Sequence, residues 1–234
     1  MDPKQNALLA ALPPEILERW LPCLEPVDLS LGPVLSESGA PLEYVYFPIS
    51  AIVSLICVME SGRGAEFAVV GFDGFVGIST FMGGESSSSS MFVKSTGRAF
   101  RLSSQMFKKE FAQTPVMHLF LRFTQALITQ ITQTAACNRH HTVRQQLCRS
   151  LLNSFDRLRG DELVMTHELI SNMLGVRREG VSDAAFVLQS SKIIIYARGR
   201  IRMLDRLALE GRSCECYSVV KHEYDRLLPC IPCA

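Results

Sequence analysis

The sequence contains no uninterrupted run of 18 apolar residues, although 47% of its 234 residues are hydrophobic. Its most apolar stretch, residues 67–82, is broken by three glycines and one aspartate, so the sequence predicts no membrane-spanning helix. The start of the chain, Met-Asp-Pro-Lys-Gln, lacks the basic and apolar segments of a secretory signal. We therefore expect a cytoplasmic protein with no membrane partner.

The sequence also lacks a recognisable pairing of nucleophile and base, and it lacks a glycine-rich loop for phosphate. The histidines are scattered: His140 adjoins His141, while His167 and His222 lie farther along. These absences argue against an enzyme, and we predict no cofactor and no catalytic residue.

Cysteine is not scarce, but nothing places the eight cysteines in an oxidising compartment. Four lie among apolar residues and are expected to pack as small hydrophobic side chains: Cys23, Cys57, Cys137 and Cys148. The other four form a C-x-C pair and a C-x-x-C pair: Cys214, Cys216, Cys230 and Cys233. These spacings suit zinc or thiol–disulfide exchange, but we favour inert thiols and keep the four as minor candidates for a metal site.

The net charge of +1 is unevenly distributed. Residues 139–212 hold 13 basic and 8 acidic side chains, whereas residues 1–138 hold 9 basic and 12 acidic ones. A basic module suits an anionic partner such as nucleic acid.

The pattern of apolar and turn-forming residues changes along the chain. Short amphipathic helices are predicted within residues 6–24. Residues 27–102 consist of short β-branched and aromatic runs separated by turn residues, which is typical of a small antiparallel barrel or roll. The serine-rich segment 83–90 is expected to be a loop.

A long helix is predicted over residues 107–138, where glycine is absent and one proline, Pro115, interrupts near the start. Apolar and small side chains recur along it every three or four residues: Phe120, Phe123, Leu127, Ile131 and Thr134. Such a seam is typical of a coiled coil between two protomers, and it also suits a helix that packs on its own barrel. We favour the first interpretation, and the pattern leaves the second open.

Residues 166–189 predict two short helices that meet at Gly175. Thr166 can cap the first helix, and Gly175 can adopt the left-handed conformation that a tight corner requires. Gly180 is unexplained, because a glycine inside a helix costs roughly 1 kcal/mol relative to alanine.

The outer face of the second helix carries side chains that suit DNA: Arg177, Arg178, Glu179, Ser182 and Asp183. Arginine can bind guanine, and a carboxylate can accept a hydrogen bond from cytosine. A hairpin is predicted at residues 191–204, where Arg198 and Arg200 can reach phosphates.

The chain resembles the Crp/Fnr family of bacterial transcription regulators in the order of its predicted parts: a β-roll with glycine-rich turns, a long helix and a winged helix-turn-helix. The strongest likeness is the segment GVRREGVSDAAFVLQ, in which Arg178 and Glu179 match a pair of the family's recognition helix. The resemblance implies phosphate contacts from Thr166 and His167 and a wing contact from Arg198. Asp183 departs from the pattern, because the type member carries a second base-reading arginine there.

The resemblance also implies an α+β fold with a cyclic-nucleotide-binding-like β-roll, or double-stranded β-helix. It places an effector pocket at Gly74, Gly77, Ile78 and Ser88. Ile78 stands where members that bind cyclic AMP have glutamate, and a serine near Ser88 stands where they have arginine. Because that arginine holds the cyclic phosphate, we do not expect a cyclic nucleotide.

These observations divide the chain into a roll (1–106), a dimerisation helix (107–138), a winged helix-turn-helix (139–212) and a C-terminal helix with a cysteine-containing tail (213–234). We expect that helix to dock on the DNA-binding domain. The favoured function is a homodimeric transcription regulator that binds an inverted repeat in double-stranded DNA and, as the resemblance implies, contacts RNA polymerase. The alternative is a small-ligand, redox-sensing or metal-sensing module that does not bind DNA.

Overall fold

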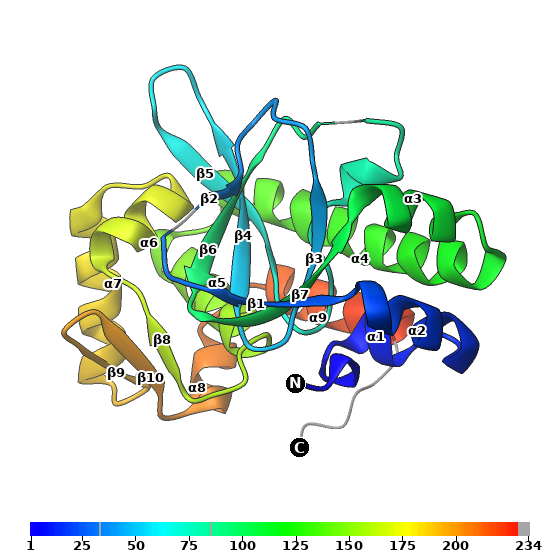
Figure 1. Ribbon diagram of the computed structural model, residues 1–234. Helices are drawn as coiled ribbons and strands as arrows, with labels where there is room; N and C mark the ends of the chain where they lie inside the picture. Colours follow the sequence, from blue (N-terminus) through cyan, green and yellow to red (C-terminus); the bar gives the residue numbers. More distant parts are fainter. Residues whose placement is uncertain (33, 85, 229–234) are drawn as a thin grey trace.

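The structure, a computed structural model, describes residues 1–32, 34–84 and 86–228. A roll of two antiparallel sheets lies at the centre, with the N-terminal helices on one side and a small helical domain on the other, and a long helix runs behind the roll toward that domain (Figure 1). No helix in these ranges combines the length and the apolar character that a membrane crossing would need.

The N-terminal half has the elements that the sequence predicts. Two short helices come first, α1 (Ala7–Ala10) and α2 (Pro14–Trp20). The strands of the roll follow: β1 (Glu25–Leu29), β2 (Val34–Ser36), β3 (Tyr44–Pro48), β4 (Ile52–Val58), β5 (Gly64–Val70), β6 (Ser90–Ser95) and β7 (Gly97–Ser103). One sheet has the order β1-β7-β3 and the other β2-β6-β4-β5, with antiparallel neighbours throughout.

The long helix differs from its prediction at both ends. The segment before Pro115 forms a separate helix, α3 (Ser104–Phe111), and α4 (Thr114–His140) follows it. Pro115 lies in the first turn of α4. Backbone N–H groups there have no acceptor within the helix, so the absence of an N–H on proline costs no hydrogen bond. Residues 107–138 are therefore not one continuous helix.

The apolar seam of α4 faces its own roll. Phe120, Phe123 and Leu127 are each 0% exposed, and the Phe120 ring lies 4.8 Å from that of Phe75. The roll leaves room for the helix at Gly74, where a Cβ would lie 2.2 Å from the Phe123 ring. The prediction that these three side chains join two protomers is therefore wrong, because their own roll already buries them.

The remaining seam residues lie nearer the end of α4. Ile131 is half-buried. Thr134 is buried and accepts a hydrogen bond from Arg149 Nη1 at 3.0 Å. Neither side chain is free to form the centre of an interface between protomers.

The C-terminal half is a winged helix-turn-helix followed by two helices. Its elements are α5 (Val143–Phe155), β8 (Glu162–Val164), α6 (His167–Leu174), α7 (Arg178–Ser190), β9 (Ile194–Ala197), β10 (Arg200–Met203), α8 (Arg206–Gly211) and α9 (Glu215–Leu227). Thr142 and Gln145 form a reciprocal capping box that starts α5 directly after α4 ends.

The two halves share a buried surface. Ile52 and Val69 of the roll belong to the same apolar cluster as the inner faces of α5, α6 and α7. Arg157, which follows α5, is 3% exposed, forms an ion pair with Asp73 at 3.0 Å and lies over the ring of Tyr224 at 4.5 Å. The helix-turn-helix is therefore packed directly against its own roll.

Two expectations about the C-terminal segment and the cysteines hold only in part. The start of helix α9 packs on the DNA-binding domain through Tyr217, but most of the helix lies along α4, where the Tyr224 hydroxyl donates to Gln130 Oε1 at 3.2 Å. Cys23 and Cys57 are exposed, whereas Cys137 and Cys148 are buried as expected. Apolar neighbours in sequence do not guarantee burial, because side chains alternate sides along strands and helices.

Candidate nucleic-acid interface

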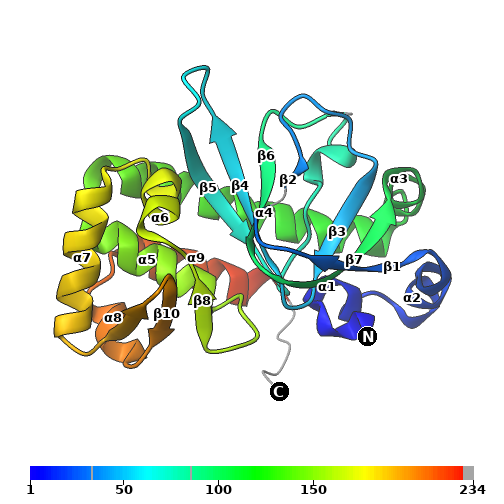
Figure 2. The same cartoon turned by 60° about the vertical axis from the view of Figure 1, so that its left-hand side comes forward.

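The corner between α6 and α7 forms as the sequence predicts. The Thr166 hydroxyl accepts from the backbone N–H of Leu169 at 3.1 Å and caps α6. Gly175 ends α6 with φ +67°, the left-handed conformation that favours glycine. Helix α7 then leaves the corner and lies along the outer surface of the molecule (Figure 2).

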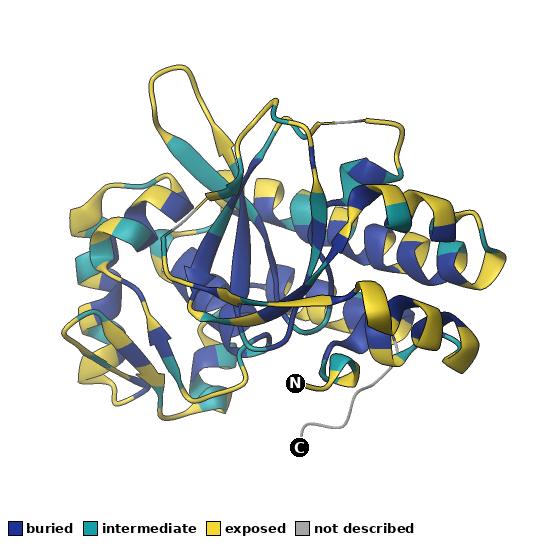
Figure 3. Ribbon diagram, viewed as in Figure 1, coloured by how far each residue is buried: buried dark blue, intermediate teal, exposed yellow. Residues whose placement is uncertain are grey.

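Helix α7 keeps its polar face in water. Arg177 precedes the helix as its N-cap, and Arg178, Glu179 and Asp183 are all exposed. The opposite face packs inside through four apolar side chains: Val181, Ala184, Ala185 and Leu188. The outer yellow and inner blue sides of α7 are visible in Figure 3. The expected orientation of the helix is confirmed, while the contacts with bases remain predictions.

Phe186 is a candidate DNA-contact residue that was not predicted from the sequence. Its side chain is 72% exposed. It lies on the outer face of α7, seven residues after Glu179 and three after Asp183. The helical period was the available signal, because residues three, four and seven apart share one face. An exposed aromatic ring there can contact a thymine methyl group.

Two of the predicted DNA-contact residues, His167 and Ser182, form a hydrogen bond with each other. Ser182 Oγ and His167 Nδ1 lie 2.9 Å apart, and the His167 ring stacks on Tyr196 with 4.4 Å between centroids. Burial lowers the pKa of His167, and the nearby Arg178 guanidinium lowers it further. In the structure His167 and Ser182 hold the α6–α7 corner together, and phosphate contacts from them remain predictions.

The hairpin of β9 and β10 forms the predicted wing. Its two-residue turn is Arg198-Gly199, with φ +52° and +74°, which matches the twist of the flanking strands. Arg198 is exposed at the tip. Arg200 instead pairs with Glu162 on β8 at 3.0 Å, so much of its charge is already balanced.

Three of the predicted contact arginines therefore keep a free positive charge. Within residues 1–32, 34–84 and 86–228, Arg177, Arg178 and Arg198 form no ion pair, whereas Arg200 and Arg202 do. These three guanidinium groups lie at the start of α7 and at the tip of the wing. An exposed cation without a counter-ion is suited to a phosphate or to the O6 and N7 atoms of guanine.

A pocket of about 390 Å³ opens in the roll beside α4. Gly77, Ile78 and Ser88 line it as predicted, whereas Gly74 serves to accommodate Phe123 and is not among the lining residues. The lining also includes apolar side chains from the roll and α4 and a row of serine residues. None of the described lining residues carries a charge.

Comparisons with known proteins agree with this architecture. Residues 26–114 match the family model of the cyclic nucleotide-binding domain, and residues 145–212 match that of the Crp-like helix-turn-helix domain. Together the two matches cover about two thirds of the chain. A search of curated proteins gave no match.

Solved structures share the fold at low sequence identity. A transcriptional regulator of the Crp/Fnr family from Eubacterium rectale is 16% identical, with a TM-score of 0.68 over 89% of this chain and 98% of its own. A CRP-family regulator from Thermus thermophilus is 18% identical, with a TM-score of 0.66 over 80% and 96%. The c-di-GMP-responsive regulator CLP of Xanthomonas campestris is 15% identical, with a TM-score of 0.65 over 81% and 98%.

Proposed function

Since the chain belongs to the Crp/Fnr family of transcription regulators, we propose that it acts in the cytoplasm as a homodimer that reads an inverted repeat in DNA. The observation that carries this proposal is the outer face of α7, where Arg177 and Arg178 are exposed and without ion pairs among the described residues. In a two-fold dimer, two such helices enter major grooves that are separated by one turn of the duplex, about 34 Å.

The reading of bases rests on residues at the start of α7. Arg178 can form two hydrogen bonds with guanine, and Glu179 can accept from the amino group of cytosine. Asp183 lies one turn later on the same face. Its carboxylate is repelled by phosphate, so we expect it to favour a cytosine and to change the operator relative to family members with arginine there.

A second row of α4 offers the dimer contact that the first seam does not. The side chains of this row are exposed and follow one another at spacings of four and three residues: Leu121, Gln125, Ile128, Thr132 and Ala135. Leu121 is 46% exposed and Ile128 is 50% exposed. This spacing is that of the a and d positions of a coiled coil, so two copies of α4 can pair along it.

The pocket of the roll suggests the chemistry of the signal. Because no described lining residue is charged, a cyclic phosphate would be held there only by hydroxyls and backbone groups. We expect an uncharged, largely apolar effector with a few hydrogen-bonding groups near the serine row. Contact with RNA polymerase is proposed from the family alone.

Selection of bound sequences from a random pool of DNA duplexes tests the proposal. The expected result is an inverted repeat, with affinity that falls steeply as the salt concentration rises. Arg178→Ala should lose discrimination at one base pair of each half-site, worth about 1–3 kcal/mol. The exposed Arg98 on β7 is the matched control, and Arg98→Ala should select the same repeat. Failure to enrich any sequence would contradict the proposal.

A further inference from the structure

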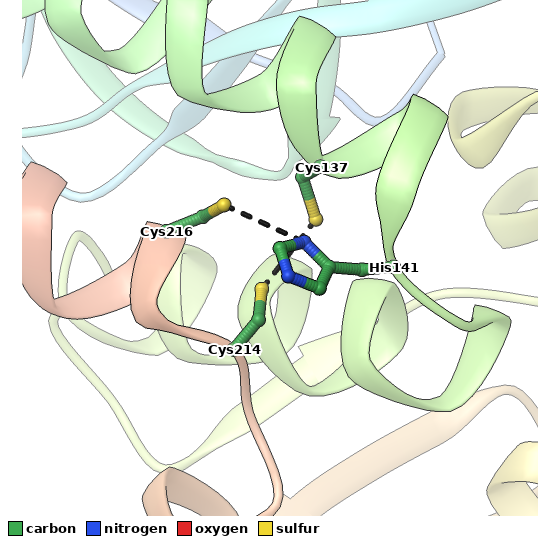
Figure 4. A group of neighbouring side chains, drawn as sticks. All are labelled: Cys137, His141, Cys214 and Cys216. Carbon is green, nitrogen blue, oxygen red and sulfur yellow. Dashed lines mark hydrogen bonds between the residues drawn. The ribbon is translucent and has the colours of Figure 1, made fainter.

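Four side chains that the DNA-binding function does not use converge at the end of α4. Cys137 and His141 lie one helical turn apart, and Cys214 and Cys216 come from the start of α9. Figure 4 shows the three thiols and the imidazole turned toward one common point. The three cysteines are buried and the histidine is half-buried.

The distances fit one tetrahedral ion. Zn–S bonds of about 2.3 Å and Zn–N bonds of about 2.0–2.1 Å give edges of about 3.8 Å between sulfurs and about 3.6 Å between sulfur and nitrogen. Cys137 Sγ lies 3.5 Å from Cys214 Sγ, and Cys216 Sγ lies 3.6 Å from His141 Nδ1. All four atoms lie within 4.8 Å of one another, so small side-chain rotations bring the wider pairs to bonding positions.

The imidazole of His141 is oriented for metal binding. The Glu215 carboxylate, from the residue between the two cysteines of the C-x-C pair, lies 3.3 Å from His141 Nε2. A carboxylate at this nitrogen fixes its N–H there and leaves the lone pair of Nδ1 directed at the thiols. Histidine ligands of metals are usually held in this way.

A buried positive charge beside the cluster also favours a metal–thiolate site. Arg149 on α5 is 5% exposed and donates from Nε to Cys137 Sγ at 3.2 Å. Among the described residues it forms no ion pair, and its other hydrogen bond goes to the neutral Thr134. Three thiolates around one Zn²⁺ carry a net charge of −1, which would balance this buried guanidinium.

We propose that Cys137, His141, Cys214 and Cys216 bind one Zn²⁺ in a closed, tetrahedral site. Each thiol loses its proton to solvent as its Zn–S bond forms, and His141 Nδ1 supplies its lone pair, so no oxidant or reductant is needed. Four protein ligands leave no position for water, which makes the site structural rather than catalytic. This set shares only Cys214 and Cys216 with the set suggested by sequence spacing, whose Cys230 and Cys233 lie outside the described residues.

Two other uses of these thiols explain less of the geometry. A disulfide between Cys137 and Cys214 would give no role to His141 or to the Glu215 carboxylate beside it. An iron–sulfur cluster needs ligands spread around a body of several atoms, whereas these four donor atoms converge on one centre. The site would tie the start of α9 to the end of α4, beside the link into the helix-turn-helix.

Metal analysis of the full-length protein purified under reducing conditions tests the site. We expect about one zinc per chain in the wild type and a loss of most of it in Cys216→Ser. The exposed Cys57→Ser variant is the matched control and should keep one zinc, as should the double variant Cys230→Ser/Cys233→Ser. Iron instead of zinc, no metal after dialysis against Zn²⁺, or full zinc content in Cys216→Ser would each overturn the proposal.

A milder variant guards against a simple folding failure. Glu215→Gln keeps the four ligands and should lower zinc affinity about 10–100-fold in competition with a chelator. Substitution of Co²⁺ for Zn²⁺ should give the visible spectrum of a tetrahedral, thiolate-rich site, and an octahedral spectrum would contradict the geometry. Neither readout depends on DNA, so the zinc site and the proposed function can fail separately.

Discussion

Helices α4 and α7 each have an apolar and a polar side, but they differ in the side that is left for a partner. Helix α7 leaves charged residues such as Arg178 in water and packs its apolar side inside. Helix α4 buries one apolar seam in the roll and leaves a second row, which includes Leu121 and Ile128, exposed. Burial of an unpaired charge costs free energy. Burial of an apolar side chain is favourable whether the covering surface belongs to the same protomer or to a partner.

The largest effect should come from the buried seam of α4. Phe120→Ala should lower the free energy of unfolding by about 3–5 kcal/mol, because it leaves a cavity between α4 and the aromatic rings of the roll. Urea unfolding measures this loss. If Phe120→Ala kept its stability and instead separated two protomers, the buried seam would be a dimer contact after all.

Substitution in the exposed row of α4 should change the oligomeric state rather than the stability of the protomer. Ile128→Asp would bring two like charges into the proposed dimer contact, so we expect a shift from dimer to monomer with little change in the secondary structure of each protomer. Light scattering after size-exclusion chromatography gives the mass. Arg122→Asp, at an exposed position one residue outside the row, is the control and should remain dimeric. A dimer of unchanged mass in Ile128→Asp would exclude this row as the contact.

The wing offers a smaller contrast between two arginines. Arg198→Ala should reduce the slope of log affinity against log salt by about 1, because one phosphate contact is lost. Arg200→Ala should change the slope less, since Glu162 already holds Arg200 in an ion pair. Salt titrations of DNA binding measure both slopes, and equal changes would show that the ion pair opens on DNA.

Gly180 on α7 should give the smallest change. A Cβ there would lie 3.8 Å from the Val143 side chain, an ordinary contact, so the fold does not require glycine. Gly180→Ala should therefore raise the free energy of unfolding by about 1 kcal/mol. Thermal unfolding measures the gain. Lower stability would contradict the expected fit, and a more stable variant with weaker DNA binding would indicate that the duplex approaches this part of α7 closely.

Features set by neighbouring residues were predictable from the sequence. The Thr166 cap, the left-handed Gly175 and the Arg198-Gly199 turn depend on local backbone preferences. The outward face of α7 followed from its helical period. These local signals are sufficient to locate the candidate DNA-binding surface.

Features that depend on distant contacts were not predictable in the same way. The pairing of Arg200 with Glu162 depends on the register of β10 against β8. The Cys137–His141 pair lies more than 70 residues from the C-x-C pair, and α9 had to pack along α4 to join them. A cysteine and a histidine four residues apart near the end of a helix were the signal, but their partners depend on the tertiary fold.

Hydroxyl-radical footprinting of the protein on its selected operator shows directly whether two α7 helices contact the duplex. We expect two half-sites protected by a dimer, with centres about one helical turn apart. In Arg178→Ala, which loses one base contact in each half-site, the same protection should require a higher protein concentration, whereas Arg98→Ala should protect at the wild-type concentration. A single protected half-site, or protection by Arg178→Ala at the wild-type concentration, would contradict the claim that paired α7 helices read the major groove.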